Sequence, residues 1–335
     1  MLNDKILLAY GAGGSETNEL ISSIFRENFA NPCLTADDAA VLPAPAGKMA
    51  MTTDGFIVSP FEFPGGNIGK LSICGTVNDL ACMGAKPLYL TCSFVIEEGF
   101  LTAKLREIAE SMAQTAKEAG VKIVAGDTKV TGAGQADKIF ITTTGVGEIA
   151  PGIELSGTKT QAGDAVILTG DPGRHACAIL LARDSYHMTA DVKSDCAPLW
   201  ETVKTLLDSG CRIHTIRDAT RGGVGTVLYE IAHQSGVGIR LDAAAIPSDP
   251  AVKGLCGMLG LEPLYLACEG RLVIFAPQEE ADKIITLLRR GKYSSNAAVI
   301  GTVSKEMAEE VTVRTEIGAE TRLPIPGGEL LPRIC

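Results

Sequence analysis

Hydrophobic positions in the first half of the chain alternate between the spacing of helices and that of strands. Residues 102–119 give the clearest helix, because apolar side chains recur there at every third or fourth position and Gly120 follows where a helix end favours glycine. Further helices are predicted over residues 16–25 and 67–84, and strands over residues 48–53, 87–96, 121–125 and 138–149. The first of these strands is expected to end at Asp54.

The second half shows the same mixture of spacings. A buried-type strand is predicted over residues 164–169, with helices over 174–183, 198–208, 223–234 and 279–290 and strands over 238–241, 271–275, 297–302 and 310–314. Residues 150–163, which are rich in proline, glycine and threonine, separate the two halves as a linker. The pattern indicates an α/β (α+β) protein of two domains.

Composition narrows the possible functions. The chain has 335 residues, enough for about two domains, and 46% of them are hydrophobic. Its net charge of −10 argues against nucleic acid and against an anionic membrane surface, which both need a basic face. The longest apolar run, residues 176–182, is far too short to span a bilayer, and the N-terminus lacks a secretory signal. We therefore expect a cytoplasmic protein with no nucleic-acid or membrane partner.

One of the ten cysteines has an unusual position. No two cysteines are closer than eight residues, so neither a CxxC pair nor a zinc-ribbon spacing is present. Cys335 is the last residue of the sequence and ends a segment, 323–335, that contains three prolines and two glycines. Proline removes hydrogen-bond donors and glycine loosens the chain, so we expect an extended, mobile tail that carries a thiol.

Several carboxylates fall at or near the ends of predicted elements. Each alone is typical of a turn or a helix cap. Together they supply hard oxygen ligands from four separate elements, and a magnesium–ATP site needs a few such carboxylates beside the phosphates and water. In a chain without a P-loop this is one way to hold a nucleotide. The carboxylates are Asp37, Asp38, Asp54, Asp79 and Asp127.

Other segments carry weaker signals. The glycine-rich residues 11–15 can surround a phosphate with backbone N–H groups, but they form neither a P-loop nor a dinucleotide motif. Residues 217–223 carry two arginines and a glycine pair before a helix, which suits either an anion site or an ordinary helix start. Lys129 is either a phosphate-binding residue or a solvated residue of a loop. Glu269 can act as a general base if burial raises its pKa. His175 is the only histidine in a glycine-rich loop context.

Taken in order, several motifs resemble those of the HypE family of hydrogenase maturation factors. The resemblance covers essentially the whole chain and includes its ending, Pro-Arg-Ile-Cys. Broader relatives, the aminoimidazole ribonucleotide synthetase-like ATP enzymes, share the acidic motifs but lack the thiol tail. The motifs lie at residues 52–54, 63–71, 74–81, 83–87, 126–130, 194–199, 217–223 and 332–335.

The resemblance implies a two-domain aminoimidazole ribonucleotide synthetase-like fold. Residues 1–150 would form the N-terminal ATP-binding and dimerisation domain, whose mixed sheet builds a barrel-like interface in a homodimer with ATP bound along it. Residues 160–320 would form a C-terminal α/β domain, and residues 323–335 a flexible tail that carries Cys335.

The resemblance also implies an activity. A carbamoyltransferase, HypF, would load a carbamoyl group onto Cys335, and this protein would use ATP and Mg²⁺ to dehydrate it to a thiocyanate. The cyano group would then pass to an iron-bearing scaffold complex, HypC–HypD, as a cyanide ligand of the nickel–iron hydrogenase centre.

Site residues follow from the same resemblance. Cys335 would be the carrier, Glu269 the base, and Lys129 the group that polarises the carbamoyl oxygen or binds phosphate. Asn78 and Lys70 would join the five aspartates in binding ATP. The expected magnesium ligands are Asp37, Asp54, Asp79 and Asp127, with Asp38 in the same phosphate-binding group.

Two positions depart from the family pattern, and both are expected to line the cleft. Cys268 stands where the family usually has asparagine, and Arg174 stands where it usually has aspartate. Two other functions remain open from the residues. A small-molecule kinase or synthetase of the same superfamily would use the acidic site without needing the tail. A scaffold would use the tail only as a docking peptide.

Overall fold

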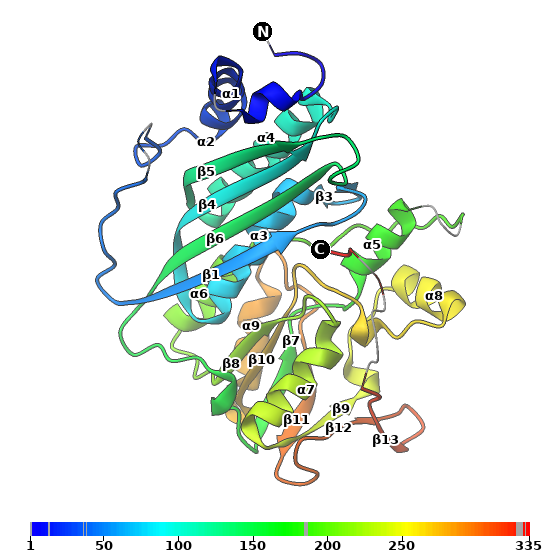
Figure 1. The fold of residues 1–335 in the computed structure, drawn as a ribbon. Helices are drawn as coiled ribbons and strands as arrows, with labels where there is room; N and C mark the ends of the chain where they lie inside the picture. The colour runs from blue at the N-terminus through cyan, green and yellow to red at the C-terminus, as the bar shows by residue number, and fades with distance from the viewer. Residues whose placement is uncertain are drawn as a thin grey trace.

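The computed structural model describes residues 2–12, 14–35, 37, 39–183, 187–325, 331 and 333–335. Its two halves each combine a sheet with helices, and the described end of the chain lies between them, beside α5 (Figure 1). Within these residues, no helix is both long and apolar enough to cross a membrane.

The N-terminal sheet has four strands, in the order β1-β6-β4-β5. All neighbours are antiparallel except β4 and β5, which are parallel. Two long helices, α3 and α4, pack behind the sheet (Figure 1). The elements are β1 (Lys48–Phe56), β4 (Ala85–Glu97), β5 (Lys122–Thr131), β6 (Ile139–Ile149), α3 (Ile68–Cys82) and α4 (Thr102–Ala119), with a short hairpin of β2 (Glu62–Phe63) and β3 (Gly66–Asn67) before α3.

The α4 prediction is confirmed at both ends. Its buried residues include Leu105, Ile108 and Met112, and Gly120 adopts the left-handed conformation, with φ 69°, that ends the helix. Two strands run further than the sequence indicates. Strand β1 continues through Asp54 to Phe56 because β6 pairs with it along its whole length. Strand β5 continues to Thr131 because it pairs with β4, so Lys129 lies in a strand and not in a loop.

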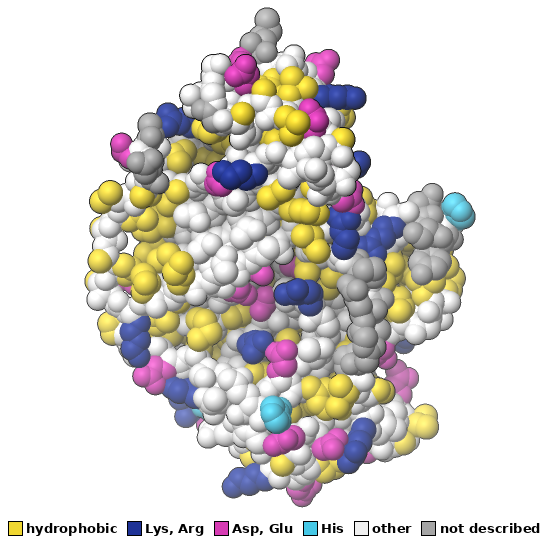
Figure 2. All heavy atoms as spheres, in the orientation of Figure 1, with side chains coloured by type: hydrophobic (Ala, Val, Ile, Leu, Met, Phe, Trp, Pro, Cys, Tyr) yellow, Lys and Arg dark blue, Asp and Glu magenta, His cyan; other side chains and the backbone are white. Residues whose placement is uncertain are grey.

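In the described part of the chain, no helix covers the far face of the N-terminal sheet. Alternate residues of β1 point to this side, and Met49 and Met51 there are 59% and 66% exposed. Figure 2 shows this face as mostly uncharged, with hydrophobic patches and few acidic or basic side chains. An uncovered, mostly uncharged sheet face with exposed methionines is typical of a protein interface.

A helical segment at the N-terminus covers the edge of the sheet near β5 (Figure 1). The side chain of Phe25 stacks on Phe94 of β4 with ring centroids 4.6 Å apart, which fixes the segment to the sheet. The predicted helix at 16–25 is present but begins one residue earlier and continues through a π-helical turn. The elements are η1 (Leu8–Gly11), α1 (Ser15–Leu20), η2 (Ile21–Arg26) and α2 (Glu27–Phe29).

The C-terminal half is built on a seven-stranded sheet of order β13-β12-β9-β11-β7-β10-β8. Its central strands, β7 and β10, are buried along almost their whole length. The strands are β7 (Asp164–Leu168), β8 (Thr215–Asp218), β9 (Gly238–Asp242), β10 (Leu272–Pro277), β11 (Ala298–Ser304), β12 (Val311–Arg314) and β13 (Glu320–Arg322). The α-helices are α5 (Arg174–Ala182), α6 (Trp200–Asp208), α7 (Gly223–Ser235), α8 (Pro250–Leu259) and α9 (Ala281–Arg289). Short 3-10 turns are η3 (Gly157–Lys159), η4 (Ala243–Ala245), η5 (Pro263–Tyr265) and η6 (Gln278–Glu280).

The two halves share a continuous apolar core. Buried residues of α3, such as Cys74 and Val77, belong to the same cluster as Leu199 and Trp200 of the second half. Asn78 joins the halves directly: its Nδ2 donates to the backbone oxygens of Ala197 and Glu269 at 3.1 and 3.4 Å. The cavity described next lies along this junction.

Candidate active site

A cavity of about 370 Å³ lies between the two halves. Strand β1 and helix α3 form one wall, and β8 with the start of α7 forms the other. Its lining is rich in charge and contains the last residue of the sequence. The charged and thiol-bearing residues are Asp54, Asp79, Arg217, Asp218, Arg221, Glu230, Glu269 and Cys335.

Three aspartates repel one another in this cavity. Burial, followed by the charge of Asp79, raises the pKa of Asp54 to about 6. The same two causes, in the same order, raise the pKa of Asp218 to about 7. Burial also raises the pKa of Asp79, although Thr52 Oγ1 donates a hydrogen bond to its Oδ2 at 2.7 Å. A site of this kind favours a cation or a proton.

Glu269 is the most deeply buried acid of the cavity, at 2% exposure. Among the described residues, its Oε1 has no hydrogen-bond partner. Burial is the main cause that raises its pKa well above the ordinary value, and neighbouring thiol and carboxyl groups add to it. The sequence indicates that Glu269 can act as a general base if burial raises its pKa, and in the structure burial does raise it.

Cys335 is held at the mouth of this cavity by backbone contacts. The N–H of Ile57 donates to Cys335 O at 3.1 Å, and the N–H of Ser59 donates to Arg333 O at 3.2 Å. The Arg333 side chain donates to Ile57 O at 2.9 Å and pairs with Asp137. The described end of the tail thus runs beside the segment after β1 like an added strand.

The thiol of Cys335 is weakly acidic in this position. Burial raises its pKa to about 12, the charge of Glu269 adds to the rise, and Arg221 opposes it. Because thiolates and not thiols are nucleophiles, the raised pKa makes the docked side chain a weaker nucleophile at neutral pH than a free cysteine.

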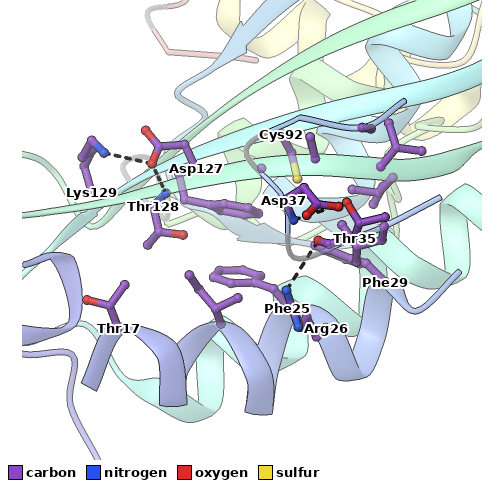
Figure 3. Close-up of a pocket in the computed structure, with 18 of the residues that line it drawn as sticks. Thr17, Phe25, Arg26, Phe29, Thr35, Asp37, Cys92, Asp127, Thr128 and Lys129 are labelled. Atoms are coloured by element: carbon purple, nitrogen blue, oxygen red, sulfur yellow. Dashed lines mark hydrogen bonds and ion pairs between the residues drawn. The ribbon is translucent and has the colours of Figure 1, made fainter. Parts of the chain in front are cut away.

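A second cavity, of about 340 Å³, lies at the β5 edge of the N-terminal sheet. Figure 3 shows Asp127 and Lys129 at one end and Thr35 and Asp37 at the other, with Phe25 projecting from the helical segment below. Lys129 Nζ lies 2.9 Å from Asp127 Oδ1, which also accepts the N–H of Thr128 at 2.9 Å.

Strand register explains why the expected aspartates separate into two sets. Asp54 lies in one row across the sheet with Thr143, Cys92 and Gly126. The next row contains Gly55, Thr142, Ser93 and Asp127. Adjacent rows face opposite sides of a sheet, so Asp54 points towards α3 while Asp127 points to the open face.

The remaining expected site residues lie elsewhere. Asn78 is buried, and its three side-chain hydrogen bonds to described residues go to the backbone of the other half, including Leu199 N–H at 2.8 Å to its Oδ1. It positions Glu269 in the present structure. Lys70, in the first turn of α3, donates to Gly65 O at 3.0 Å. Asp38 lies outside the described residues. Nowhere in the described part of the chain do three or more metal-ligating side chains gather closely enough to hold an ion.

The two departures from the family pattern do not line the cavity, which corrects the expectation that they do. Cys268 is fully buried in the second apolar cluster, where its Sγ accepts the N–H of Gly173 at 3.2 Å. Arg174 is not among the residues that line the cavity; it pairs with Asp171 and donates to Asp249 Oδ2 at 2.7 Å. Both changes are accommodated behind the site.

Asp218 is the residue that sequence reasoning placed least well. The sequence indicates only an anion site or a helix start for residues 217–223, whereas the structure places Asp218 in β8, near Asp79 and Asp54. In the same segment Gly222 precedes α7 in the left-handed conformation, and Arg221 faces the cavity. The three charged residues within the five positions Arg-Asp-Ala-Thr-Arg were the available signal.

The sequence matches two domain families in tandem. Residues 36–149 match the AIR synthase related protein, N-terminal domain, and residues 161–314 match the AIR synthase related protein, C-terminal domain. The chain therefore belongs to the AIR synthase related family, and the two-domain mixed α/β fold expected from the sequence is confirmed.

Within that family the chain belongs with the HypE proteins. It is 44% identical to carbamoyl dehydratase HypE of Rhodobacter capsulatus over 99% of each chain. A crystal structure of hydrogenase maturation protein HypE in complex with ATP superposes with a TM-score of 0.94, at 43% identity and over 98% of this chain and 99% of that one. HypE in a HypE–HypF complex superposes with a TM-score of 0.81, at 42% identity and over 93% and 100% of the chains. The family resemblance found in the sequence is confirmed.

Proposed function

We propose that this protein is an ATP-dependent carbamoyl dehydratase that converts an S-carbamoyl group on Cys335 to a thiocyanate. The product supplies cyanide ligands for the nickel–iron hydrogenase centre. The observation that carries the proposal is the docking of Cys335 in a cavity that also holds Glu269 and three aspartates. The relatives named carbamoyl dehydratase match this chain along its whole length.

The reaction needs ATP because an amide oxygen is a poor leaving group. The carbamoyl oxygen attacks the γ-phosphorus, an O–P bond forms, and ADP leaves. The C–O bond then breaks with its electron pair on the departing phosphate, and the two N–H protons leave as the C≡N bond forms. One proton goes to a base and the other leaves with the phosphate. Each reacting S–CO–NH₂ group and ATP thus give S–C≡N, ADP and phosphate.

Glu269 is the base in this proposal. In its ionised form, a carboxylate destabilised by burial is a stronger base than a free one, which suits it to accept a proton from nitrogen. Arg221 and Arg217 line the same cavity and supply positive charge beside it. Cations in such a position stabilise the charge on a phosphoryl group in transfer.

Magnesium fits the aspartates of this cavity. The charge of Asp79 raises the pKa of Asp54, so a cation between the two carboxylates would be stabilising. Mg²⁺ commonly uses one or two carboxylates together with phosphate oxygens and water. When bound, the ion would neutralise phosphate charge. Asp54 and Asp79 would hold it, while the Asp37 and Asp127 of the same chain lie at the other cavity.

A homodimer accounts for that separation. Asp127 and Lys129 face the open side of the sheet, where the Met49 and Met51 side chains are exposed. Pairing of two open faces would bury the methionines and place each Asp127–Lys129 pair at the shared interface, where both can contact an ATP bound along it. Lys129 then serves as a phosphate-binding residue.

Two partners follow from the proposed reaction. The docked thiol has a pKa of about 12, so carbamoylation requires a dedicated transferase, and a relative has been crystallised in a HypE–HypF complex. We therefore propose HypF as the donor. We propose that the acceptor is an electron-rich iron in the HypC–HypD scaffold. Its electron pair would form the iron–carbon bond, while the S–C bond breaks and leaves its own electron pair on Cys335 as a thiolate.

Intact-mass measurement tests the proposal. The full chain is incubated with ATP, Mg²⁺, carbamoyl phosphate and the transferase, beside a Cys335→Ser control. We expect a mass increase of one carbamoyl group, followed by loss of one water, in the wild type only. ATP hydrolysis without modification of Cys335 would favour a small-molecule kinase, and neither ATP turnover nor modification would favour a scaffold.

A further inference from the structure

Helix α5 holds two backbone carbonyls of the tail directly before Cys335. His175 Nε2 lies 2.7 Å from Ile334 O, and Arg183 Nη2 donates to Arg333 O at 2.9 Å. Both donors lie on one helix, His175 in its first turn and Arg183 at its C-terminal cap. The tail is therefore bound from the second half of the molecule as well as from the segment after β1.

The hydrogen bonds of His175 are consistent with only one tautomer. A carbonyl oxygen only accepts, so Nε2 carries the hydrogen and donates to Ile334. Ser194 Oγ lies 2.8 Å from Nδ1 and accepts the N–H of Cys196 at 3.0 Å, which leaves its hydroxyl hydrogen to point at Nδ1. Burial is the main cause that lowers the pKa of His175, so the ring stays neutral.

The donor is also fixed in place before the tail arrives. The ring of His175 is fully buried, and Phe63 packs edge-on against it with centroids 5.2 Å apart. Ser194 is anchored in turn, because its N–H donates to Pro64 O at 2.8 Å. If the tail leaves, the Nε2–H exchanges the Ile334 carbonyl for water, and the net free energy of the hydrogen bond is lost. The ring therefore favours the docked tail.

From these contacts we propose that His175 is a positioning residue for the dehydration step. Its Nε2–H binds the Ile334 carbonyl and keeps Cys335 in the acidic cavity, and it touches neither the thiol nor ATP. This inference rests on the proposed function and adds to it the residue that decides how much of the tail is docked.

The test compares His175→Phe with His175→Gln in the full chain. Phenylalanine keeps a flat ring but removes the donor, whereas the glutamine amide donates from nearly the position of Nε2. His214→Phe is the matched control, because His214 lies in the same half, hydrogen-bonds Asp164 at 2.9 Å, and does not contact the tail. The rates of Cys335 alkylation by iodoacetamide and of water loss from the carbamoylated chain are measured, with Cys335→Ser giving the background from the other thiols.

We expect His175→Phe to lower the ratio of docked to undocked tail by about fivefold, as loss of one hydrogen bond implies. Cys335 is then alkylated faster and water is lost more slowly than in the wild type, and the two factors multiply to about five. Carbamoyl loading should be unchanged or faster. His175→Gln should restore most of both rates, and His214→Phe should leave them unchanged. A general loss of structure would slow loading as well and would not be rescued by glutamine.

Wild-type alkylation and water loss in a folded His175→Phe protein would overturn the inference. If that variant fails to fold, Ser194→Ala removes only the donor to Nδ1, and it should shift both rates in the same direction by a smaller factor. No shift in that variant would also overturn the inference. If the wild type itself forms no thiocyanate, the proposed function fails, while the alkylation ratio still decides the role of His175.

Discussion

Replacing Asp218 by asparagine should make the protein more stable at neutral pH and less active. Burial and the neighbouring Asp79 raise the pKa of Asp218 from 3.8 to about 7. The folded protein therefore holds a proton that the unfolded chain has already released, and its stability falls as the pH rises from about 3.8 to about 7. Asparagine at this position removes that loss.

The size of the effect follows from the shift. One pKa unit corresponds to 1.36 kcal/mol, so the interval from pH 5 to pH 7 corresponds to about 2.7 kcal/mol. At pH 7 the folded Asp218 carboxyl is already about half ionised, which lowers the expected value to about 2 kcal/mol. The advantage of Asp218→Asn should therefore grow by about 2 kcal/mol between pH 5 and pH 7 and then stay constant to pH 8.

Urea unfolding of both proteins at half-unit pH steps measures this difference. Asp208→Asn is the control, because Asp208 is an exposed aspartate at the end of α6, and its difference from the wild type should not change with pH. A pH-independent difference for Asp218→Asn would refute the reasoning, as would a loss of stability at pH 8. The same variant should turn over ATP more slowly, because one charge of the cavity is gone.

Two further substitutions test the other parts of the site. Glu269→Gln should slow water loss from the carbamoylated chain by at least about 10²-fold while leaving carbamoyl loading intact, as intact mass over time will show. An unchanged rate would remove Glu269 as the base. Met51→Asp should leave the fold intact, since Met51 is 66% exposed, but convert a dimer to monomers and weaken ATP binding, as light scattering and calorimetry will show. A Met51→Leu protein should remain dimeric, and a dimeric Met51→Asp protein would contradict the proposed interface.

The sequence was most informative where local pattern alone decides the structure. Helix α4 has a regular apolar stripe and a left-handed glycine after it, and neither depends on distant parts of the chain. Helix α8 was not predicted, although its signal was present: Asp249 caps it by accepting the N–H groups of Ala251 and Val252, and Pro250 occupies its first turn. Short strands such as β8 carry too few residues for a period to be counted.

The candidate site was predictable as a set of residue types but not as an arrangement. The sequence identifies Asp54 and Asp127 as carboxylates near strand ends, yet strand length and register place them on opposite faces of one sheet. A change of one residue in strand register moves every side chain to the opposite face of the sheet. Pairing with strands that are distant in the sequence decides this register. The contact of His175 with Ile334 spans 159 positions and has no local signal.

The docking of Cys335 has a consequence for how the rate depends on concentration. A substrate carried on the enzyme's own chain meets the site at an effective concentration set by the tether and by the docked fraction, not by diffusion. Dehydration is then first order, with no saturation constant for the carbamoyl group, and dilution does not slow it while each chain keeps its ATP. Changing the length of the segment between Leu323 and Arg333 should alter the rate as changing the substrate concentration does in other enzymes.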